Sequence, residues 1–419
     1  MAGGGLTRNP DFLRLWAGQT ISAFGSMFGA LSLTALVFLH ASAAQMGLLA
    51  MAGGVPALLF ALFAGVWVDR LHRRPIMIAA DLGRAVLLLT VPAAALADSL
   101  YIEHLYAVAF LVGFLALGFD VAYRSYLPSV VEREELLEGN SKLSATESIA
   151  EAASPAIGGW IVQAASGPVA VVVDAMTFLS SAVCIGAIRR KEPPPERSAD
   201  SGVLKELREG LALVRHDRVL RALVGAAGTF RFFGGFFEAL YAVFLIRTLD
   251  FSPLLMGITI GAGGIGSFGG ALVTGVLTRR LGYGPSILVS RVAIDVFALL
   301  IPLAGGPKEV AFAMIFVAQL CGDPFWATYE IATTSLRQSI APERALGRVN
   351  STMHVVQAGL QPVGALVAGI LAEVIGVRET LWVAVGGGFL GIGWLLASPV
   401  PRLRGAPVVT EPAPPHDVQ

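Results

Sequence analysis

Long apolar runs recur along the whole chain, and short polar segments separate them. A helix needs about 20 apolar residues to cross the hydrocarbon core of a bilayer, and these runs reach that length. The pattern therefore predicts an all-α membrane protein with twelve transmembrane helices. The predicted helices cover residues 12–39, 45–68, 76–98, 102–127, 138–164, 168–188, 218–245, 253–281, 284–304, 308–336, 344–375 and 378–398.

Polar segments divide the chain into two sets of six helices. Residues 189–217 are the only long hydrophilic stretch inside the sequence, so we expect a cytoplasmic linker between bundles at 1–188 and 218–398. The tail at 399–419 is rich in proline, and we expect it to be disordered in the cytoplasm. The first apolar run is too long for a signal-peptide core, so we expect an uncleaved first helix.

The two halves resemble each other when the sequence is displaced by 210 positions. Parallel repeats of six helices are a transporter architecture, with a substrate site between the halves and alternating access by rocking. The displacement therefore predicts two six-helix bundles with a central cavity. It pairs Met46-Gly47 with Met256-Gly257, Gly53-Gly54 with Gly263-Gly264, Arg70-Leu71 with Arg280-Leu281, Asp120 with Glu330, and Asn140 with Asn350.

Composition supports the membrane assignment and excludes several functions. Only 14% of the residues are charged and 55% are hydrophobic, whereas soluble domains have about 25% charged residues. The net charge of +0 gives no indication of nucleic-acid binding. We expect no metal site, no cofactor and no enzymatic activity. The chain has no P-loop, so ATP does not drive transport by this chain alone.

Basic residues set the predicted orientation. Most of the 30 Lys and Arg fall in or beside the segments on the same side as the N-terminus. Because cytoplasmic loops of membrane proteins are enriched in Lys and Arg, we expect both termini in the cytoplasm. The predicted location is the cytoplasmic (inner) membrane, with several passes and a monomeric chain.

A basic loop follows the second predicted helix and reads Gly65-Val66-Trp67-Val68-Asp69-Arg70-Leu71-His72-Arg73-Arg74-Pro75. It resembles the signature cytoplasmic loop of the major facilitator superfamily, Gly-x-x-x-Asp-Arg-x-Gly-Arg-Arg, with His72 in place of the second glycine. Asp81-Leu82-Gly83-Arg84-Ala85 and the segment from Ser339 to Asn350 are similar to the drug–proton antiporter group. That group includes macrolide efflux proteins and the enterobactin exporter.

The fifth predicted helix contains Ala153-Ser154-Pro155-Ala156-Ile157-Gly158-Gly159. This segment resembles the antiporter motif Gly-Pro-x-x-Gly-Gly, which in that family distinguishes exporters from importers. The resemblance implies export, with Ser154 replacing the first glycine. Proline removes a backbone hydrogen bond and glycines allow close helix approach, so Pro155, Gly158 and Gly159 predict a helix bend at a packed interface.

The basic loop also predicts a gate on the cytoplasmic side. Asp69 could engage the N-terminal end of a neighbouring helix, and Arg73 could pair with Asp120. Such contacts would latch the outward-open form. The alternative is that these charges only anchor the chain at the membrane surface. The predicted gating residues are Asp69, Arg70, Arg73, Asp120 and Arg124.

Ionisable residues at bilayer depth are costly and therefore indicate function. Glu147 and Glu151 lie one helical turn apart before Pro155. A proton shared between them could be exchanged as the cavity opens to either side, so we predict that they couple transport to protons. The alternative places Glu147 in solvent at the membrane edge and Glu151 against a neighbouring helix.

Aromatic and charged residues on the seventh and tenth predicted helices indicate a substrate cavity. Phenylalanines on several faces suit bulky aromatic or amphipathic ligands, and the charged pair Arg231 and Glu238, two turns apart on one face, would add polar contacts. The alternative is that the rings face lipid or core. We interpret Arg291 and Asp295 as an internal ion pair. The predicted cavity residues are Arg231, Phe233, Phe237, Glu238, Tyr241, Asp323 and Trp326.

Together these features predict a secondary transporter that exports drug-like or siderophore-like molecules by proton antiport. Its expected partners are a small-molecule substrate, protons and the lipid bilayer. One alternative keeps the fold and reverses the direction, giving proton-coupled import of a metabolite. Another is a non-transporting sensor or a lipid translocase on the same scaffold.

Overall fold

The computed structural model describes residues 6–26, 29–69, 71–132, 135–190, 192, 203–340 and 343–405, and every regular element in these ranges is a helix. The first half contains η1 (Leu6–Arg8), α1 (Pro10–Ser26), α2 (Ala30–Leu33), η2 (Thr34–Phe38), α3 (Ala43–Asp69), α4 (Arg73–Leu96), α5 (Ile102–Val130), α6 (Leu136–Ala164) and α7 (Gly167–Gly186).

The second half begins after a linker helix, α8 (Val203–His216). It contains α9 (Arg218–Val243), η4 (Phe244–Thr248), α10 (Pro253–Leu281), α11 (Tyr283–Ala298), α12 (Leu300–Leu303), α13 (Lys308–Ile340), α14 (Glu343–Ile375), α15 (Val377–Leu396) and η5 (Val400–Arg402). The first, seventh and ninth passes each combine two or three of these helical segments.

Within the described ranges, 11 helices are long and apolar enough to cross a membrane. The remaining pass is α6, which is as long as its neighbours but carries Glu138, Lys142, Glu147 and Glu151. These charges lower the hydropathy of α6, and it is not among the 11. The predicted all-α membrane fold with twelve helices is confirmed.

The backbone repeats at the displacement found in the sequence. Two short π-helical turns, η2 and η4, end the first and seventh passes, and their first residues Thr34 and Phe244 are 210 positions apart. His40 and Asp250 keep the same spacing, and both have positive φ angles, of 52° and 53°. The repeat therefore extends from the residue pattern to the local geometry of the chain.

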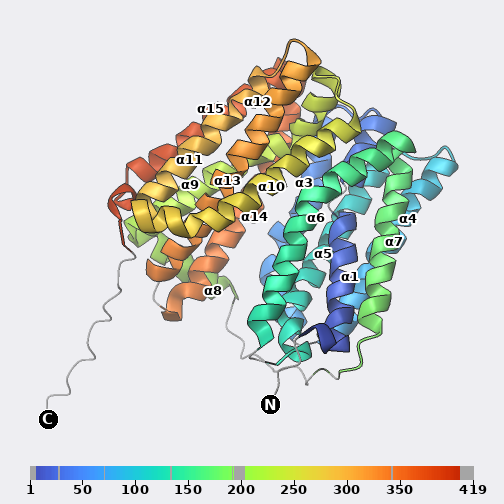
Figure 1. Ribbon diagram of the computed structural model, residues 1–419, viewed down its shortest axis with the longest axis horizontal. Coiled ribbons are helices and arrows are strands. Elements are labelled where there is room, and N and C mark those ends of the chain that lie inside the picture. The colour runs from blue at the N-terminus through green and yellow to red at the C-terminus, as the bar shows by residue number, and fades with distance from the viewer. Residues whose placement is uncertain are drawn as a thin grey trace.

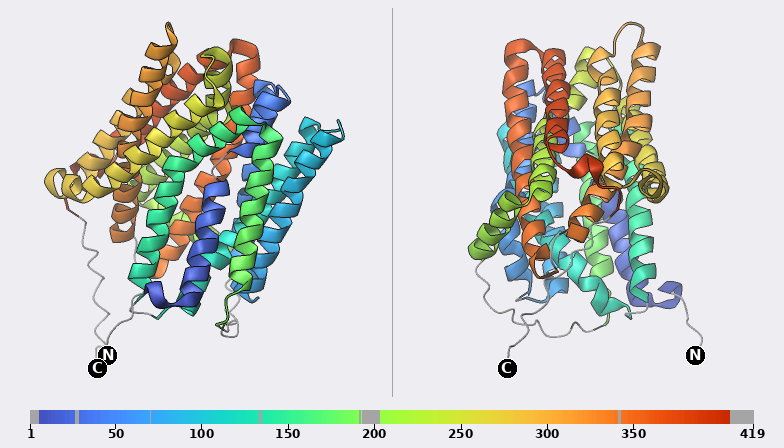
Figure 2. Two further views of the ribbon diagram at one scale, coloured as in Figure 1. Left: turned by 45° about the vertical axis from the view of Figure 1, so that its right-hand side comes forward. Right: turned by 90° about the vertical axis from the view of Figure 1, so that its left-hand side faces the viewer.

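The helices form two bundles that lie side by side (Figures 1 and 2). Helices α1 and α3–α7 pack on one another, α9–α11 and α13–α15 form the second group, and the groups meet chiefly where α3 packs on α14 and α6 packs on α10. The bundles diverge toward the end that carries the N-terminus and α8 (Figure 1).

Small residues allow the two bundles to meet closely. A side chain on Gly47 would collide with Gly369, and one on Gly264 would collide with Ala152. Backbones that approach this closely gain dispersion contacts without needing a hydrophobic driving force, as is common between membrane helices. Gly264, Gly266 and Gly269 have the spacing of a dinucleotide-binding motif, Gly-x-Gly-x-x-Gly. They lie inside the helix α10 and not in a loop after a strand, so they do not form that motif.

Candidate functional site

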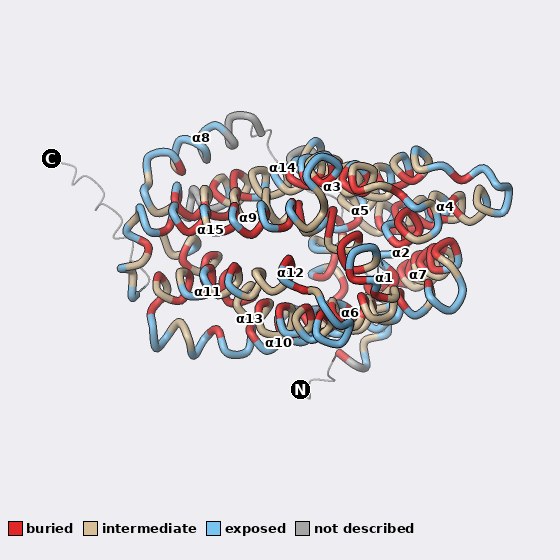
Figure 3. The backbone as a smooth tube through the Cα atoms, turned by 90° about the horizontal axis from the view of Figure 1, so that it is seen from above, coloured by how far each residue is buried: buried red, intermediate tan, exposed pale blue. Residues whose placement is uncertain are grey.

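A cavity of about 480 Å³ lies among the second-half helices α9, α10, α11, α13 and α15, with α2 and α6 contributing from the first half. Its size is typical of small-molecule sites. Viewed from above, α9 and α15 lie on one side and α10, α11 and α13 on the other (Figure 3). The first half contributes only Gly29, Ser32, Leu33 and Pro155 to the lining. The cavity is therefore built unequally by the two halves.

Helical spacing places aromatic side chains on the cavity wall. Phe233, Phe237 and Tyr241 are four residues apart on α9, so they share one face, and all three line the cavity. Trp326 on α13 also lines it. The predicted cavity residues Phe233, Phe237, Glu238, Tyr241, Asp323 and Trp326 thus lie around one space.

Arg231 is the one predicted cavity residue that lies outside this lining. Its guanidinium forms an ion pair of 3.3 Å with Glu330 on α13. It also donates to Gln361 Oε1 on α14 at 3.4 Å. Gln361 Nε2 in turn donates to Glu238 at 2.7 Å. The expected partnership of Arg231 with Glu238 is therefore made through Gln361, which the sequence interpretation did not single out.

Asp323 occupies space that a glycine leaves open. A side chain at Gly263 of α10 would collide with the Asp323 carboxylate. Across the junction of the halves, the negative charge of Glu151 acts on Asp323. Apart from Asp295, which is paired with Arg291, the cavity has the carboxylates of Glu238 and Asp323, and Glu151 lies close by, so the cavity is acidic.

Arg291 and Asp295 form the predicted internal ion pair, with a 2.8 Å contact between Nη1 and Oδ1. Arg291 also donates to the Gly388 carbonyl at 2.7 Å, and its guanidinium lies over the Phe230 ring at 4.6 Å. Both side chains are buried and line the cavity. Sequence reasoning found the pair but not its position, because the spacing of two charges on a helix does not reveal what the other helices place opposite them.

The predicted gating residues Arg73, Asp120 and Arg124 lie at the end of the molecule where the bundles diverge. Arg73 pairs with Glu192 of the linker at 3.3 Å, so the expected pair with Asp120 is not formed in this structure. Asp120 and Arg124 lie exposed on α5, where the charges of Arg84 and Arg124 act on Asp120. Asp69 ends α3, but its side chain and Arg70 lie outside the described residues.

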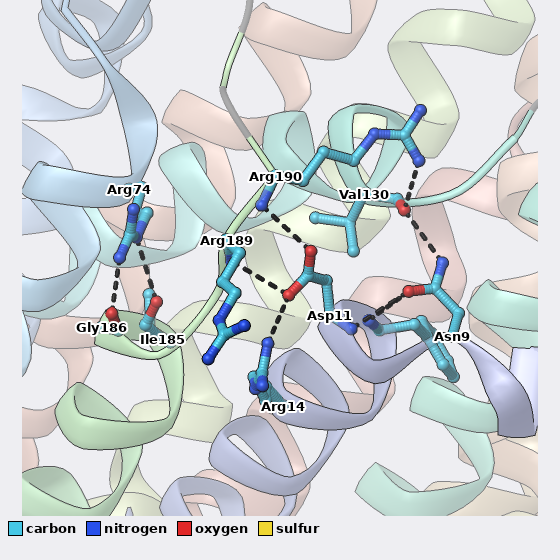
Figure 4. A network of polar contacts seen from close by, with 10 residues as sticks. Asn9, Asp11, Arg14, Arg74, Val130, Ile185, Gly186, Arg189 and Arg190 are labelled. Carbon is cyan, nitrogen blue, oxygen red and sulfur yellow. Dashed lines mark hydrogen bonds and ion pairs between the residues drawn. The ribbon is translucent and has the colours of Figure 1, made fainter.

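The chain that leaves α7 is fastened to the base of the first bundle, as Figure 4 shows. Asp11 accepts hydrogen bonds of 3.0 Å from the backbone N–H groups of Arg189 and Arg190. Arg190 donates to the Val130 carbonyl at 2.9 Å, and Arg74 donates to the carbonyls of Ile185 and Gly186. These contacts hold the first residues of the linker beside the basic loop.

The two predicted coupling residues face different neighbours. Glu147 lies exposed on α6, where the charges of Arg124 and Asp120 on α5 act on it. Glu151, one turn further, instead has its like-charged neighbour Asp323 in the opposite half. Glu147 and Glu151 are one turn apart on α6, but they therefore have different helices as neighbours.

The residues predicted to bend α6 lie at the junction of the halves. A side chain on Gly159 would collide with Pro253, and one on Gly257 would collide with Pro155. Gly158 is buried on the same helix. Pro155 also lines the cavity, so this segment connects the closed junction with the candidate substrate site.

Comparison with known proteins assigns the family. The family model for the Major Facilitator Superfamily matches residues 15–360. The chain belongs to this superfamily. It is 28% identical to the multidrug efflux pump Tap of Mycolicibacterium fortuitum, over 97% of this chain and 99% of Tap. It is 24% identical to macrolide efflux protein A of Streptococcus pyogenes, over 88% and 91% of the two chains. The resemblance to the superfamily and to macrolide efflux proteins is thus confirmed.

Solved structures share the fold. A mutant of the nucleoside transporter NupG superposes with a TM-score of 0.79 at 12% identity, over 93% of this chain and 99% of that chain. A bacterial homologue of the iron transporter ferroportin gives 0.72 in its inward-facing state, at 15% identity over 92% and 98%. The outward-facing state of that homologue gives a TM-score of 0.60 at 16% identity, with the same coverage.

Within the described residues, no group of three His, Cys, Asp or Glu side chains could hold a metal ion.

Proposed function

We propose that this superfamily member is a monomeric secondary transporter that exports drug-like or siderophore-like molecules by proton antiport. In this proposal it lies in the cytoplasmic membrane with both termini in the cytoplasm. The two bundles rock about the cavity, and the segment 189–217 links them. Its similarity to two named efflux pumps over most of its length supports export.

The acidic aromatic cavity is the observation that carries the proposal. Aromatic side chains from α9 and α13 offer flat apolar surfaces, and Glu238 and Asp323 offer charge. Such walls suit amphipathic ligands, because ring faces bury apolar area and carboxylates select a positive or hydrogen-bonding group. The position of Pro155 in the lining ties the cavity to the junction that must open and close.

The arrangement of the bundles supports alternating access. The halves touch along the N-terminal parts of α3 and α10 and the C-terminal parts of α6 and α14. They diverge toward the end of the molecule that carries the N-terminus. If that end faces the cytoplasm, the conformation is inward-facing. The higher TM-score to the inward-facing ferroportin homologue agrees with this reading. In the outward-facing form, we propose that Arg73 leaves Glu192 and pairs with Asp120, joining Asp69, Arg70 and Arg124 in the latch.

Transport into proteoliposomes tests the proposal. The purified chain is reconstituted, the lumen is made acidic, and uptake of radiolabelled erythromycin, tetracycline and enterobactin is followed. Antiport predicts accumulation that stops when an ionophore removes the pH gradient. Protein-free liposomes control for passive trapping of basic compounds in the acidic lumen. Accumulation of none of the three above that control contradicts drug and siderophore antiport, and accumulation only from an acidic outer medium indicates import.

A further inference from the structure

Three charged residues form a second buried cluster in the first half, away from the cavity. Asp81 and Arg84 lie one turn apart on α4 and form an ion pair. Asp174 on α7 acts electrostatically on the same guanidinium. The three residues are 0%, 5% and 8% exposed, and none of them lines the cavity. These three charges therefore do not contact the candidate substrate cavity.

The guanidinium of Arg84 is held in place by two aromatic rings. It lies over Phe119 of α5 at 4.6 Å and over Phe178 of α7 at 4.2 Å. Cation–π contacts of this kind fix the position of a cation in an apolar setting. The two rings therefore hold the guanidinium beside Asp81 and within the electrostatic reach of Asp174.

The cluster has more negative than positive charge. One oxygen of Asp174 is buried without a hydrogen-bond partner, and the Ser181 hydroxyl of α7 acts on Asp81. Besides these carboxylates, Asp120 of α5 acts on Arg84, whereas α1 faces Asp174 with Gly25. With both aspartates ionised, Arg84 balances only one of them. An unbalanced charge at membrane depth costs several kcal/mol, and one bound proton removes it.

The equivalent position in the second half lacks this excess. At the repeat displacement, Asp81 corresponds to Arg291, whose partner is Asp295. That pair has one carboxylate for one guanidinium, and its second Nη donates to a carbonyl. The second half thus has a balanced pair that faces the cavity, and the first half has an additional carboxylate that does not.

The first pass touches this cluster at Gly25 and the cavity at Gly29, where a left-handed backbone conformation breaks the helix. A Cβ on Gly25, near the end of α1, would lie 2.8 Å from Asp174 Oδ1. Helix α1 ends at Ser26 and α2 begins at Ala30, after Gly29 with a φ of 64°. Gly29, Ser32 and Leu33 line the cavity. A change in the position of Asp174 would therefore act on the backbone that continues into the cavity wall.

We propose that Asp81, Arg84 and Asp174 form the proton-binding site of the transporter, and that the first pass, through Gly25 and the break at Gly29, links its charge state to the cavity. This inference rests on the proposed antiport and assigns coupling to residues other than Glu147 and Glu151. Protonation releases Asp174 from Arg84, and substrate binding at the far side of the break favours return of the proton to water.

Two transport assays on the full chain in proteoliposomes separate coupling from substrate exchange. The first is accumulation of erythromycin driven by an acidic lumen. A gradient of one pH unit supports about tenfold accumulation for one proton per substrate, because a tenfold ratio corresponds to about 1.4 kcal/mol. The second is counterflow at equal pH, in which labelled erythromycin exchanges with unlabelled erythromycin inside. The variants are Asp174→Asn and Asp81→Asn, with exposed Glu138→Gln as the matched control and Glu147→Gln and Glu151→Gln as rivals.

The proposal expects Asp174→Asn to lose gradient-driven accumulation and to retain counterflow, while Glu138→Gln keeps both. Full accumulation by Asp174→Asn overturns the inference, as does loss of coupling only in Glu147→Gln or Glu151→Gln. Wild-type protein without accumulation or counterflow instead contradicts the proposed function.

A binding measurement tests the proposal in variants that bind substrate but do not transport it. Erythromycin is added to folded, monodisperse protein in weakly buffered detergent solution, and an indicator dye reports released protons. The wild-type protein should release a proton and Asp174→Asn should not. Equal proton release from both proteins overturns the proposal.

Discussion

The side-chain amide of Gln361 donates to the carboxylate of Glu238 at 2.7 Å and thereby joins α14 to the cavity wall on α9. The same amide accepts from Arg231 at 3.4 Å. Replacing Gln361 with Met keeps most of the side-chain volume and removes both bonds. Glu238 is exposed and Arg231 is half-buried, so losing these bonds should cost about 0.5–1.5 kcal/mol, and we expect a slightly lower melting temperature in detergent.

Gln338 supplies the comparison for this experiment, because it is exposed on α13. Gln338→Met should melt within error of the wild-type protein. Equal melting temperatures for Gln361→Met and wild type would show that the bridge adds nothing to stability.

Gly263 makes room for Asp323, so an added methyl group should reshape the cavity. The Cβ of Gly263→Ala would collide with the Asp323 carboxylate and would come within 3.3 Å of Gln319 Nε2. Displacements in a packed site typically cost about 1–3 kcal/mol, so we expect weaker binding of erythromycin, measured by scintillation proximity. Gly269→Ala on the same helix meets no neighbouring atom and should bind normally. Equal affinity for the two variants would exclude Asp323 from the binding wall.

Sequence periodicity could predict the helices and most of the cavity wall, because both depend on local spacing. Twelve apolar runs appear in the residue pattern, and the aromatic stripe on α9 follows from a spacing of four residues. Contacts between residues that are far apart in the sequence leave no such periodic pattern. Arg73 pairs with Glu192, which is 119 residues away, and the charge of Arg84 on α4 acts on Asp174 on α7. Only packing decides which of several available charges is nearest.

Close backbone packing between α6 and α10 should hold the halves together at one end. The Cβ of Gly264→Ala would lie 2.7 Å from Ala152 Cα, and backbone atoms cannot turn aside as a side chain can. Overpacking costs about 1–3 kcal/mol, so we expect a population shift toward the form in which this contact is open.

Spin labels at Leu137 and Val276 report the shift, because both side chains are exposed near the diverging ends of α6 and α10. Their separation should shorten in Gly264→Ala as those ends approach. Gly269→Ala should reproduce the wild-type distance distribution. An unchanged distribution in Gly264→Ala would mean that the contact does not limit rocking.

Glu192 caps a helix to which it does not belong. Its carboxylate accepts from the backbone N–H of Arg73 at 2.8 Å and of Arg74 at 3.3 Å, at the start of α4. His72, the residue before α4, makes no capping bond of its own. Because Glu192 is also paired with the Arg73 side chain and only 6% exposed, its charge stabilises both the helix end and the basic loop.

Glu192→Gln keeps an acceptor but removes the charge, so we expect a loss of about 1–3 kcal/mol, measured as a lower melting temperature. Glu138→Gln is the matched control, since Glu138 is 46% exposed beside Lys142, and such surface pairs contribute about 0–1 kcal/mol. If Glu192 also restrains the gate, its loss frees Arg73 for Asp120, and the labels at Leu137 and Val276 should move closer. A lower melting temperature with unchanged label distances would confine Glu192 to stability, and unchanged values of both would contradict either role.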